Sequence, residues 1–228
     1  MTESAFRGSL LIVVAPSGAG KTSLVRHLLD VRDGLRLSVS YTTRAVRPGE
    51  RDGVDYRFVS TEEFVARRDR GEFLEWAQVH GNFYGTSRAW IADQMAAGVD
   101  IVLEIDWQGA AQVRRMFPDA VSVFIAPPSL EVLRQRLTAR GQDAPEVIER
   151  RMAAARSELE HASECQYVII NQDFAAACQA LVGIADAARC RFAQQHVRFS
   201  VLFAELGMAR SDASTAPGQV APGGREAR

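Results

Sequence analysis

The residues with the clearest chemical potential in this sequence form the segment Ala15-Pro-Ser-Gly-Ala-Gly-Lys-Thr22. Lys21 is the single lysine of the chain, against 26 arginines. A composition that uses arginine elsewhere and keeps lysine here indicates a position that needs a compact ammonium on a flexible stem. Gly18 and Gly20 allow the backbone to bend closely around an anion, so that successive N–H groups face it at the start of a helix. The segment therefore predicts a site for nucleotide phosphates.

This segment departs in one place from the phosphate-loop pattern G-x-x-x-x-G-K-[ST], because Ala15 stands where the pattern has its first glycine. In that pattern the lysine reaches the β and γ phosphates, and the hydroxyl at Thr22 binds Mg²⁺. An ordinary glycine turn after a strand is the alternative. The apolar run at residues 10–14 and the amphipathic stretch at residues 22–29 favour a phosphate loop between a strand and a helix.

A second group of anion-binding residues follows about 25 residues later, in Ser38-Val-Ser-Tyr-Thr-Thr-Arg-Ala-Val-Arg-Pro-Gly-Glu50. Arg44 and Arg47 stand three residues apart among several hydroxyl side chains. They could be ordinary turn charges, but two anion sites in one chain indicate two phosphorylated ligands. Phosphoryl transfer between nucleotides needs that arrangement, because catalysis depends on holding donor and acceptor in line while their charge is neutralised.

Strand and helix patterns alternate along the chain and indicate how these residues are positioned. Apolar runs predict buried strands at residues 10–14, 38–40, 100–105, 120–125 and 167–170. Most of these runs are followed by stretches with a period near 3.6 residues. Such alternation predicts an α/β fold, with parallel strands, right-handed crossovers and helices on both faces of the sheet.

Two regions interrupt this alternation. Residues 41–90 are richer in glycine, tyrosine and short strand-like pieces, and predict a small mixed sheet inserted after the second strand. Residues 130–156 predict a pair of helices with arginines spaced along them. A solvated helix face is the simpler interpretation for Arg134, Arg150 and Arg156. Residues 207–228 lack apolar periodicity and predict a disordered tail.

The composition narrows the class of protein. With 47% hydrophobic and 24% charged residues, the 228-residue chain can bury a full core as one domain with insertions. It contains no 18-residue apolar stretch, so we expect a cytoplasmic protein that does not bind membranes. With a net charge of −1, the whole chain does not suggest a nucleic-acid footprint, and we expect no nucleic-acid partner, although local arginine clusters could still bind anions. The spacing of the cysteines and histidines predicts neither a disulfide framework nor a zinc site.

Seven segments of the chain match, in order, the pattern of one known family. They are Ala15-Pro-Ser-Gly-Ala-Gly-Lys-Thr22, Ser40-Tyr-Thr-Thr-Arg44, Arg47-Pro-Gly-Glu50, Gly53-Val-Asp-Tyr-Arg-Phe58, Gly81-Asn-Phe-Tyr-Gly-Thr86, Ile105-Asp-Trp-Gln-Gly109 and Arg136-Leu-Thr-Ala-Arg-Gly141. On these segments the chain resembles the guanylate kinases over residues 8–206. The resemblance implies a P-loop nucleoside-monophosphate-kinase fold with three parts. These are a core at residues 8–40, 91–129 and 157–206, a GMP-binding insertion at 41–90 and a lid at 130–156.

The resemblance also implies a role for each matching residue. The loop that holds the ATP phosphates would comprise Ala15, Pro16, Ser17, Gly18, Ala19, Gly20, Lys21 and Thr22. The GMP phosphate would be held by Arg44, Arg47, Tyr56 and Tyr84. Glu50 and Asp106 would complete the GMP site, in which Ser40, Glu75 and Thr86 read the guanine.

Physical reasoning agrees with the role of Glu75. A carboxylate there can accept hydrogen bonds from guanine N1–H and the exocyclic N2 amine together, whereas adenine offers neither donor. A buried acceptor left without its donor costs about 1–3 kcal/mol, and sites built this way discriminate by about 10⁴ to 10⁵. An exposed strand acid is the alternative. Thr86 stands where the family often carries serine, so its extra methyl predicts a slightly tighter pocket.

Asp106 follows the strand expected at residues 100–105, where an open parallel sheet presents residues to its ligand crevice. By resemblance, Asp106 would help to hold Mg²⁺ through water, while Thr22 contacts the ion directly. Capping of the next helix is the alternative for Asp106, and both roles could coexist.

In the lid, Arg136, Arg140 and Arg151 match positions that supply arginines to the ATP phosphates once the lid closes. Together with Lys21 and Arg44 they form the implied catalytic set. Asn171, at the end of the strand expected at residues 167–170, resembles a contact near the adenine of ATP.

The implied reaction is ATP + GMP giving ADP + GDP, in guanine nucleotide synthesis and recycling. Two alternatives share the fold. Guanylate-kinase-like modules of scaffold proteins bind phosphoproteins without catalysis, but here Lys21, Thr22, Arg44 and Asp106 are all present. Kinases of phosphorylated ribose lack the complete guanine-reading set. The sequence leaves open whether the protein is a monomer or a small homo-oligomer, and whether dGMP is used as well as GMP.

Overall fold

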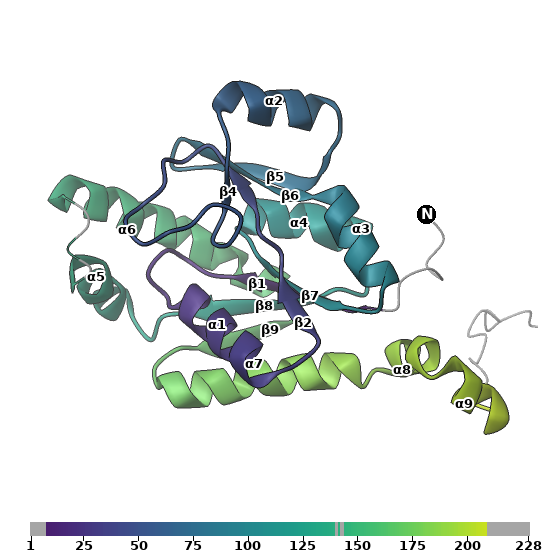
Figure 1. Ribbon diagram of the computed structural model, residues 1–228. Helices are drawn as coiled ribbons and strands as arrows, with labels where there is room; N and C mark the ends of the chain where they lie inside the picture. The colour runs from purple at the N-terminus through teal and green to yellow at the C-terminus, as the bar shows by residue number, and fades with distance from the viewer. Residues whose placement is uncertain (1–7, 140, 142–143, 209–228) are drawn as a thin grey trace, which may run out of the picture.

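A five-stranded parallel sheet forms the centre of the fold. The computed structural model describes residues 8–139, 141 and 144–208. The strand order is β2-β7-β1-β8-β9, and neighbouring strands run parallel. The strands are β1 (Leu10–Val14), β2 (Leu35–Leu37), β7 (Asp100–Glu104), β8 (Val121–Ala126) and β9 (Tyr167–Ile170). Helices cover both faces of the sheet (Figure 1), which confirms the predicted α/β class.

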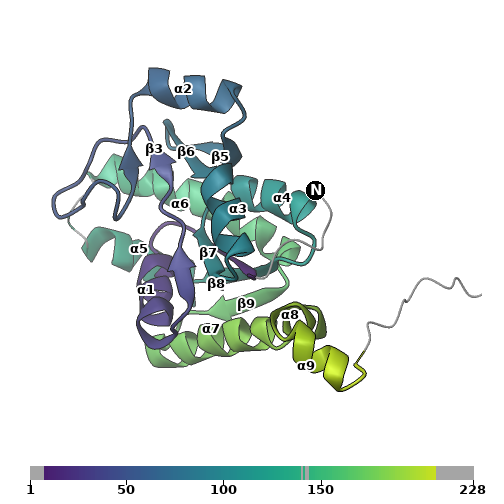
Figure 2. The ribbon, with the colours of Figure 1, turned by 45° about the vertical axis from the view of Figure 1, so that its right-hand side comes forward.

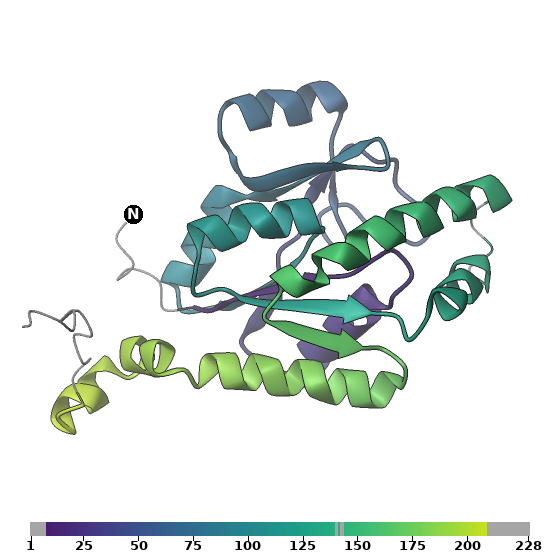
Figure 3. The ribbon, with the colours of Figure 1, turned by 180° about the vertical axis from the view of Figure 1, so that it is seen from behind.

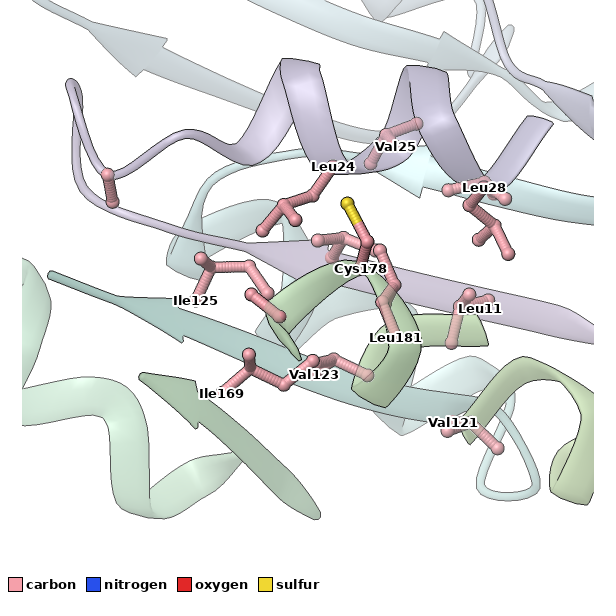
Figure 4. Close-up of a cluster of buried hydrophobic side chains, with 14 of the residues drawn as sticks. Leu11, Leu24, Val25, Leu28, Val121, Val123, Ile125, Ile169, Cys178 and Leu181 are labelled. Carbon is pink, nitrogen blue, oxygen red and sulfur yellow. The ribbon is translucent and has the colours of Figure 1, made fainter. Parts of the chain in front are cut away.

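One face of the sheet packs against α1 (Lys21–Val31) and α7 (Phe174–Arg189). All residues of β1 and β8 are buried, because both faces of these inner strands are covered. Apolar side chains from the strands and from both helices form one layer (Figure 4), including Leu11, Leu24, Leu28, Val123, Ile125 and Leu181. This layer fixes the start of α1, and therefore the loop before it, against the end of β1.

The other face of the sheet is covered by α3 (Arg88–Ala96), α4 (Trp107–Met116) and the short 3₁₀ helix η2 (His161–Glu164), as Figure 3 shows from behind. Its buried cluster joins strand residues to helix residues, among them Ile12, Leu103, Phe124, Ile91 and Val113. Because α4 follows β7 after two residues, its first turn lies at the carboxyl edge of the sheet.

A second sheet stands at one end of the core (Figure 1) and lies between β2 and α3 in the chain. Its order is β4-β3-β6-β5, with β3 (Tyr41–Thr42), β4 (Arg57–Phe58), β5 (Phe73–Val79) and β6 (Asn82–Ser87). The β3–β4 pair is parallel and the other pairs are antiparallel, so the sheet is mixed as predicted. Helix α2 (Thr61–Asp69) covers this sheet through Phe64, which is fully buried and stacks on Phe73 and Phe83.

Two further helices, α5 (Leu130–Ala139) and α6 (Pro145–Glu160), pack against each other. Their shared apolar cluster consists of Leu133, Leu137, Ile148, Met152 and Ala155. Arg134 pairs with Glu149 on the exposed side, as expected of a solvated helix face. Helix α6 continues to Glu160 without a break, so the lid boundary expected at residue 156 falls inside a helix.

The last described helices are α8 (Phe192–Arg198) and α9 (Ser200–Glu205), which extend beyond the end of α7 (Figure 2). Arg198 and Arg189 reach back to the buried carboxylate of Asp100 at the start of β7. Among residues 8–139, 141 and 144–208, none of the helices combines the length and the apolar character that a membrane crossing requires. The disordered tail expected at 207–228 falls outside the described residues, apart from Gly207 and Met208.

The structure corrects the second predicted strand. Strand β2 occupies Leu35–Leu37, and residues 38–40 leave the central sheet. The Ser38 N–H still donates to the Val102 carbonyl at 3.0 Å, but the Ser40 carbonyl accepts from the Arg57 N–H at 2.9 Å in the second sheet. The segment therefore crosses from one sheet to the other.

Candidate active site

A cleft of about 720 Å³ opens beside the carboxyl ends of the parallel strands. It lies next to β1, which is the point where the strand order reverses: the strands that follow β1 in the chain add first on its β7 side and later on its β8 side. Open α/β sheets bind ligands at such a switch point. The predicted site residues on its wall are Ala15, Pro16, Ser17, Gly18, Gly20, Lys21, Thr22, Ser40, Arg44, Arg47, Glu50, Tyr56, Glu75, Tyr84, Asp106 and Arg151. Ala19, Thr86, Arg136 and Asn171 do not line it, and Arg140 lies outside the described residues.

The loop between β1 and α1 has the backbone shape of an anion site. Gly18 and Gly20 have φ angles of 93° and 98°, in the left-handed region that favours glycine. The Ala19 N–H donates to the Pro16 carbonyl at 3.1 Å and closes a tight turn. Helix α1 begins at Lys21 with no side chain capping its N-terminus. Its first N–H groups are therefore available to an anion, together with the positive end of the helix dipole.

Two side chains at the start of α1 connect this loop to the end of β7. The Lys21 ammonium donates to the Ile105 carbonyl at 2.9 Å. The Thr22 hydroxyl donates to the Glu104 carboxylate. Both groups therefore point across the mouth of the cleft, where a phosphate on the loop would meet them.

Asp106 caps α4 and also lines the cleft. Its Oδ1 accepts from the Gly109 N–H at 2.9 Å, and its Oδ2 accepts from Nε2 of Gln108 at 3.0 Å. Asp106 therefore does cap α4, as the alternative interpretation predicted, and its carboxylate still lines the cleft.

The residues present fit a magnesium ion. Thr22, Glu104 and Asp106 offer one hydroxyl and two carboxylates, and oxygen is the donor that Mg²⁺ prefers. No group of three or more His, Cys, Asp or Glu side chains in the described part of the chain could hold a metal by itself. Such a site suits an ion that takes one or two protein oxygens and completes its shell with substrate phosphates and water.

The second anion-binding group is organised around Glu50. Nη2 of Arg44 donates to both Glu50 oxygens at 2.7 and 3.0 Å, and the Arg47 N–H donates to Oε2 at 2.8 Å. Burial opposes ionisation of Glu50, but these donors outweigh it and hold the pKa of Glu50 below its ordinary value. The Arg44 guanidinium lies 5.3 Å from the ring centre of Tyr56, which in turn lies 6.0 Å from that of Tyr84. Burial, assisted by Glu104, raises the pKa of Tyr56 to about 12, so its hydroxyl stays a hydrogen-bond donor.

Two of the residues predicted to read guanine form a buried polar pair. Thr86 and Glu75 face each other across β6 and β5, and the Thr86 hydroxyl donates to Oε1 of Glu75 at 2.6 Å. Glu75 is only 3% exposed, so the alternative of an exposed strand acid is wrong. Burial raises the pKa of Glu75 to about 7, with Asp106 adding to the shift and Thr86 and Lys21 opposing it. Ser40, also buried, lines the same cleft.

From the helical pair α5–α6, Arg151 lines the cleft, whereas Arg136 lies behind the loop. The Arg136 guanidinium donates to the Asn171 carbonyl at 2.9 Å and to the Ala19 carbonyl at 3.4 Å. Asn171 is 4% exposed, and its side-chain amide donates to the Ala19 carbonyl at 2.7 Å. A Cβ on Gly20 would lie 2.4 Å from that amide nitrogen. Asn171 therefore supports the phosphate loop from behind.

Sequence reasoning missed four acidic residues on the cleft wall, Asp30, Asp55, Glu104 and Glu158, of which the last two have contacts or a pKa shift that tie them to the phosphate loop. Glu104 stands two residues before Asp106, and residues two apart in an extended segment share a side, so that pairing was an available signal. Glu158 stands seven residues after Arg151, which is two turns along α6. Burial raises the pKa of Glu158 to about 7, although Lys21 and the Ser17 amide favour its ionised form. No recognisable motif surrounds Glu158, and only the course of α6 brings it to the loop.

Comparisons with known proteins agree with this geometry. The family model described as guanylate kinase matches residues 7–188. The guanylate kinase of Cupriavidus metallidurans is 57% identical over 206 residues, which cover 90% of this chain and 95% of that protein. The guanylate kinase of Ralstonia nicotianae is 58% identical over 206 residues, covering 90% and 93%.

The fold agrees with a solved structure as well. The crystal structure of guanylate kinase from Anaplasma phagocytophilum is similar to this chain with a TM-score of 0.71 at 33% identity, and the match covers 90% of this chain and 98% of that one. The predicted P-loop kinase fold, with its parallel core, mixed sheet and helical pair, is confirmed. On these matches, which agree with the phosphate loop and the buried Glu75–Thr86 pair described above, the chain belongs to the guanylate kinase family.

Proposed function

We infer that this chain is an ATP:GMP phosphotransferase, which moves the γ-phosphoryl group of ATP to GMP and yields ADP and GDP. Its sequence is 57–58% identical to two named guanylate kinases over nine-tenths of the chain, which supports this reaction. The structural observation that carries it is a single cleft whose wall includes both the phosphate loop and the carboxylate of the Glu75–Thr86 pair. Such a cleft suits a triphosphate and a guanine monophosphate held together.

ATP would bind through its phosphates to the loop at residues 15–22. The left-handed turns at Gly18 and Gly20 aim backbone N–H groups at the phosphate oxygens. Lys21 would leave the Ile105 carbonyl and contact the β and γ phosphates. Asn171 would act on ATP through the loop that it supports, in addition to any contact near the adenine.

GMP would bind on the opposite wall. Arg44 and Arg47 would hold its phosphate, with Glu50 orienting both and the phenols of Tyr56 and Tyr84 donating hydrogen bonds. The guanine would be read by Ser40, Glu75 and Thr86, with Asp106 between the base site and the phosphates. The free oxygen of Glu75 would accept from guanine N1–H and N2–H, since Thr86 already donates to the other oxygen.

The transfer itself needs positioning and charge neutralisation. An oxygen of the GMP phosphate attacks the γ-phosphorus in line, and the bond between that phosphorus and the β–γ bridging oxygen breaks, so that ADP leaves. The attacking phosphate is already anionic near neutral pH, so no protein nucleophile or strong base is required. The groups that offset the charge would be Lys21, Arg44, Arg136, Arg140 and Arg151.

Thr22 would hold Mg²⁺ directly and Asp106 would hold it through water. Glu104 accepts the hydrogen of the Thr22 hydroxyl, which leaves the oxygen lone pairs of Thr22 directed away from that carboxylate. When bound, the ion neutralises charge on the ATP phosphates.

The proposal divides the chain into a core at residues 8–40, 91–129 and 157–206, a GMP-binding insertion at 41–90 and a lid at 130–156. Closure of the insertion and the lid would exclude water that otherwise hydrolyses ATP. We expect a monomer or a small homo-oligomer that works in the cytoplasm, where it supplies GDP for guanine nucleotide synthesis and recycling.

A coupled assay of ADP release tests the reaction. Purified protein is mixed with ATP, Mg²⁺ and one acceptor at a time, chosen from GMP, dGMP, AMP and ribose bisphosphate. We expect rapid turnover with GMP and a kcat/KM about 10⁴-fold lower with AMP. The rate with dGMP decides whether the ribose 2′-hydroxyl is read.

Two other results would replace the proposal. ADP release with ribose bisphosphate and none with GMP would assign the chain to the phosphorylated-ribose kinases. Saturable GMP binding by calorimetry without ADP release would assign it to the non-catalytic interaction modules.

A further inference from the structure

The carboxylate of Glu75 rests on helix α4 as well as on its own sheet. At Gly109, in the first turn of α4, an added Cβ would lie 2.3 Å from Oε2 of Glu75 and 3.0 Å from its Cδ. Real Cβ atoms do not approach other atoms so closely, so a hydrogen atom is all that fits between α4 and this carboxylate. Oε2 of Glu75, the oxygen that Thr86 does not bind, therefore lies directly against Gly109.

One helical turn later, Gln112 fixes the backbone next to Glu75. Its Nε2 donates to the Trp76 carbonyl at 2.8 Å, and its Oε1 accepts from the Trp76 N–H at 3.3 Å. Among the described residues, strand β5 is an edge strand that pairs with β6 alone, so its outward backbone groups have no strand partner there. Gln112 supplies both missing hydrogen bonds and ties the edge of the second sheet to the core helix.

The same turn of α4 also holds the carboxylate of Asp106. The Gly109 N–H donates to Oδ1 of Asp106 at 2.9 Å, and the Cβ that Gly109 lacks would lie 3.3 Å from that oxygen. Asp106 and Glu75 thus both lie against Gly109, within reach of the Cβ that it lacks. The start of α4 consequently fixes the distance between the Glu75 carboxylate and the Asp106 carboxylate.

We propose that Gly109 and Gln112 are positioning residues for guanine, which act through Glu75 and set the selectivity for GMP. This inference rests on the proposed base-reading role of Glu75. Gln112 holds the β5 backbone close to α4, and this brings the Glu75 carboxylate against the helix. Gly109 leaves space for that carboxylate because it has no Cβ. A side chain at position 109 would displace the far end of Glu75, which is flexible, while the helix and strand keep their places.

The first test is Gly109→Ala, with Gly183→Ala as its matched control. Gly183 lies within α7, and a Cβ there meets nothing within 4 Å, so the control makes the same change in a helix without the contact. We expect Gly109→Ala to raise the KM for GMP by about tenfold or more and to relax the rejection of AMP. The KM for ATP should stay within about twofold of wild type, and Gly183→Ala should match wild type throughout.

The second test removes the backbone clamp. Gln112→Met keeps the length of the side chain but removes both hydrogen bonds to Trp76. We expect the KM for GMP to rise about tenfold while the KM for ATP is retained, because β5 and Glu75 move away from α4 together.

A double-mutant cycle separates positioning from a general packing effect. In a Glu75→Ala background, Gly109→Ala should change the KM for GMP by less than about twofold, since the atom it displaces is gone. An equal increase with and without Glu75 would overturn the inference, and so would an unchanged KM for GMP in a folded Gly109→Ala protein. Wild-type protein that turns over no GMP would overturn the proposed function itself, so the two failures are distinguishable.

Discussion

The hydroxyl of Thr86 donates a 2.6 Å hydrogen bond to Oε1 of Glu75, and the two residues face each other across β6 and β5. Both side chains are buried. The bond occupies one carboxylate oxygen and leaves the other to a ligand, while burial raises the pKa of the group to about 7. In the free protein, therefore, the carboxyl that we propose to bind guanine in its ionised form is close to half protonated at neutral pH.

GMP binding should therefore expel a proton from Glu75 below pH 7. Two guanine N–H groups stabilise the ionised carboxylate, so binding lowers the pKa of Glu75 again. Because the ionised fraction in the free protein rises about tenfold between pH 6 and pH 8, we expect a fall of up to about tenfold in the KM for GMP over this range. Calorimetry of GMP binding at pH 6, in two buffers of different ionisation enthalpy, counts the released protons.

Glu75→Gln is the control for this proton release. The GMP phosphate, with a second pKa of about 6, can change its protonation in both proteins, so the difference between them isolates Glu75. Equal proton release by wild type and Glu75→Gln would contradict the assignment.

Unfolding supplies a second check on Glu75, because the pKa of its carboxyl in the folded state lies above the ordinary 4.5. The stability that Glu75 contributes is full below about pH 4.5 and is lost as the pH rises through 7, so Glu75→Gln should gain stability relative to wild type over that interval.

Lys21 should be essential for turnover and dispensable for folding. Its ammonium makes one hydrogen bond to a backbone carbonyl, at the mouth of the cleft. Lys21→Ala should reduce kcat by at least about 10² to 10³ while the thermal unfolding midpoint stays close to wild type. Lys21→Arg should also lose most activity, because a planar fork cannot replace a compact ammonium at this position. Near-wild-type steady-state activity in purified Lys21→Ala would refute the role assigned to Lys21.

Asn171 should affect ATP and not GMP. Its buried amide donates to the Ala19 carbonyl and so holds the shape of the phosphate loop. Asn171→Ala should raise the KM for ATP by about tenfold and lower the free energy of unfolding by about 1–2 kcal/mol, since a buried carbonyl loses its best donor. Gln172→Ala, which changes the exposed amide beside it, is the matched control. An equal rise in the KM for GMP would point to a general loss of structure instead.

The parallel core could be predicted because its chemistry is local. Strands buried on both faces must be continuously apolar, and the bounds expected for β1 and β9 match the structure. Strand β2 was misplaced because Leu35–Leu37 is a short edge strand of mixed burial with an arginine at its centre. Helix α2 was missed although Ser60 caps it by accepting from the Glu63 N–H, a signal that the sequence contains. What secures α2 is tertiary, since Phe64 stacks on rings from β5 and β6.

The site was predictable where one motif contains its own chemistry, as in the phosphate loop. Contacts between distant segments were not predictable in this way. Thr22 and Glu104 are 82 residues apart in the chain and meet only because β7 pairs with β1. Asn171 and Ala19 are 152 apart, so no local pattern could reveal that the asparagine supports the loop. The sequence therefore supplies candidate site residues, and the fold decides which of them lie close enough to act through one another.

Asp100 should control stability without affecting the chemistry. It lies at the start of β7, at the opposite end of that strand from the cleft, and accepts from the Ser9 N–H at 2.7 Å and from the Arg198 guanidinium. Arg198 is itself largely buried, so Asp100→Asn leaves a cation without its counter-ion and should lower the free energy of unfolding by about 3 kcal/mol. Asp186→Asn removes a carboxylate from a more exposed pair and should change the unfolding midpoint little. At a temperature where both variants are folded, Asp100→Asn should keep the wild-type KM for ATP and GMP. A selective loss of GMP affinity in Asp100→Asn would show that the start of β7 also acts on the site.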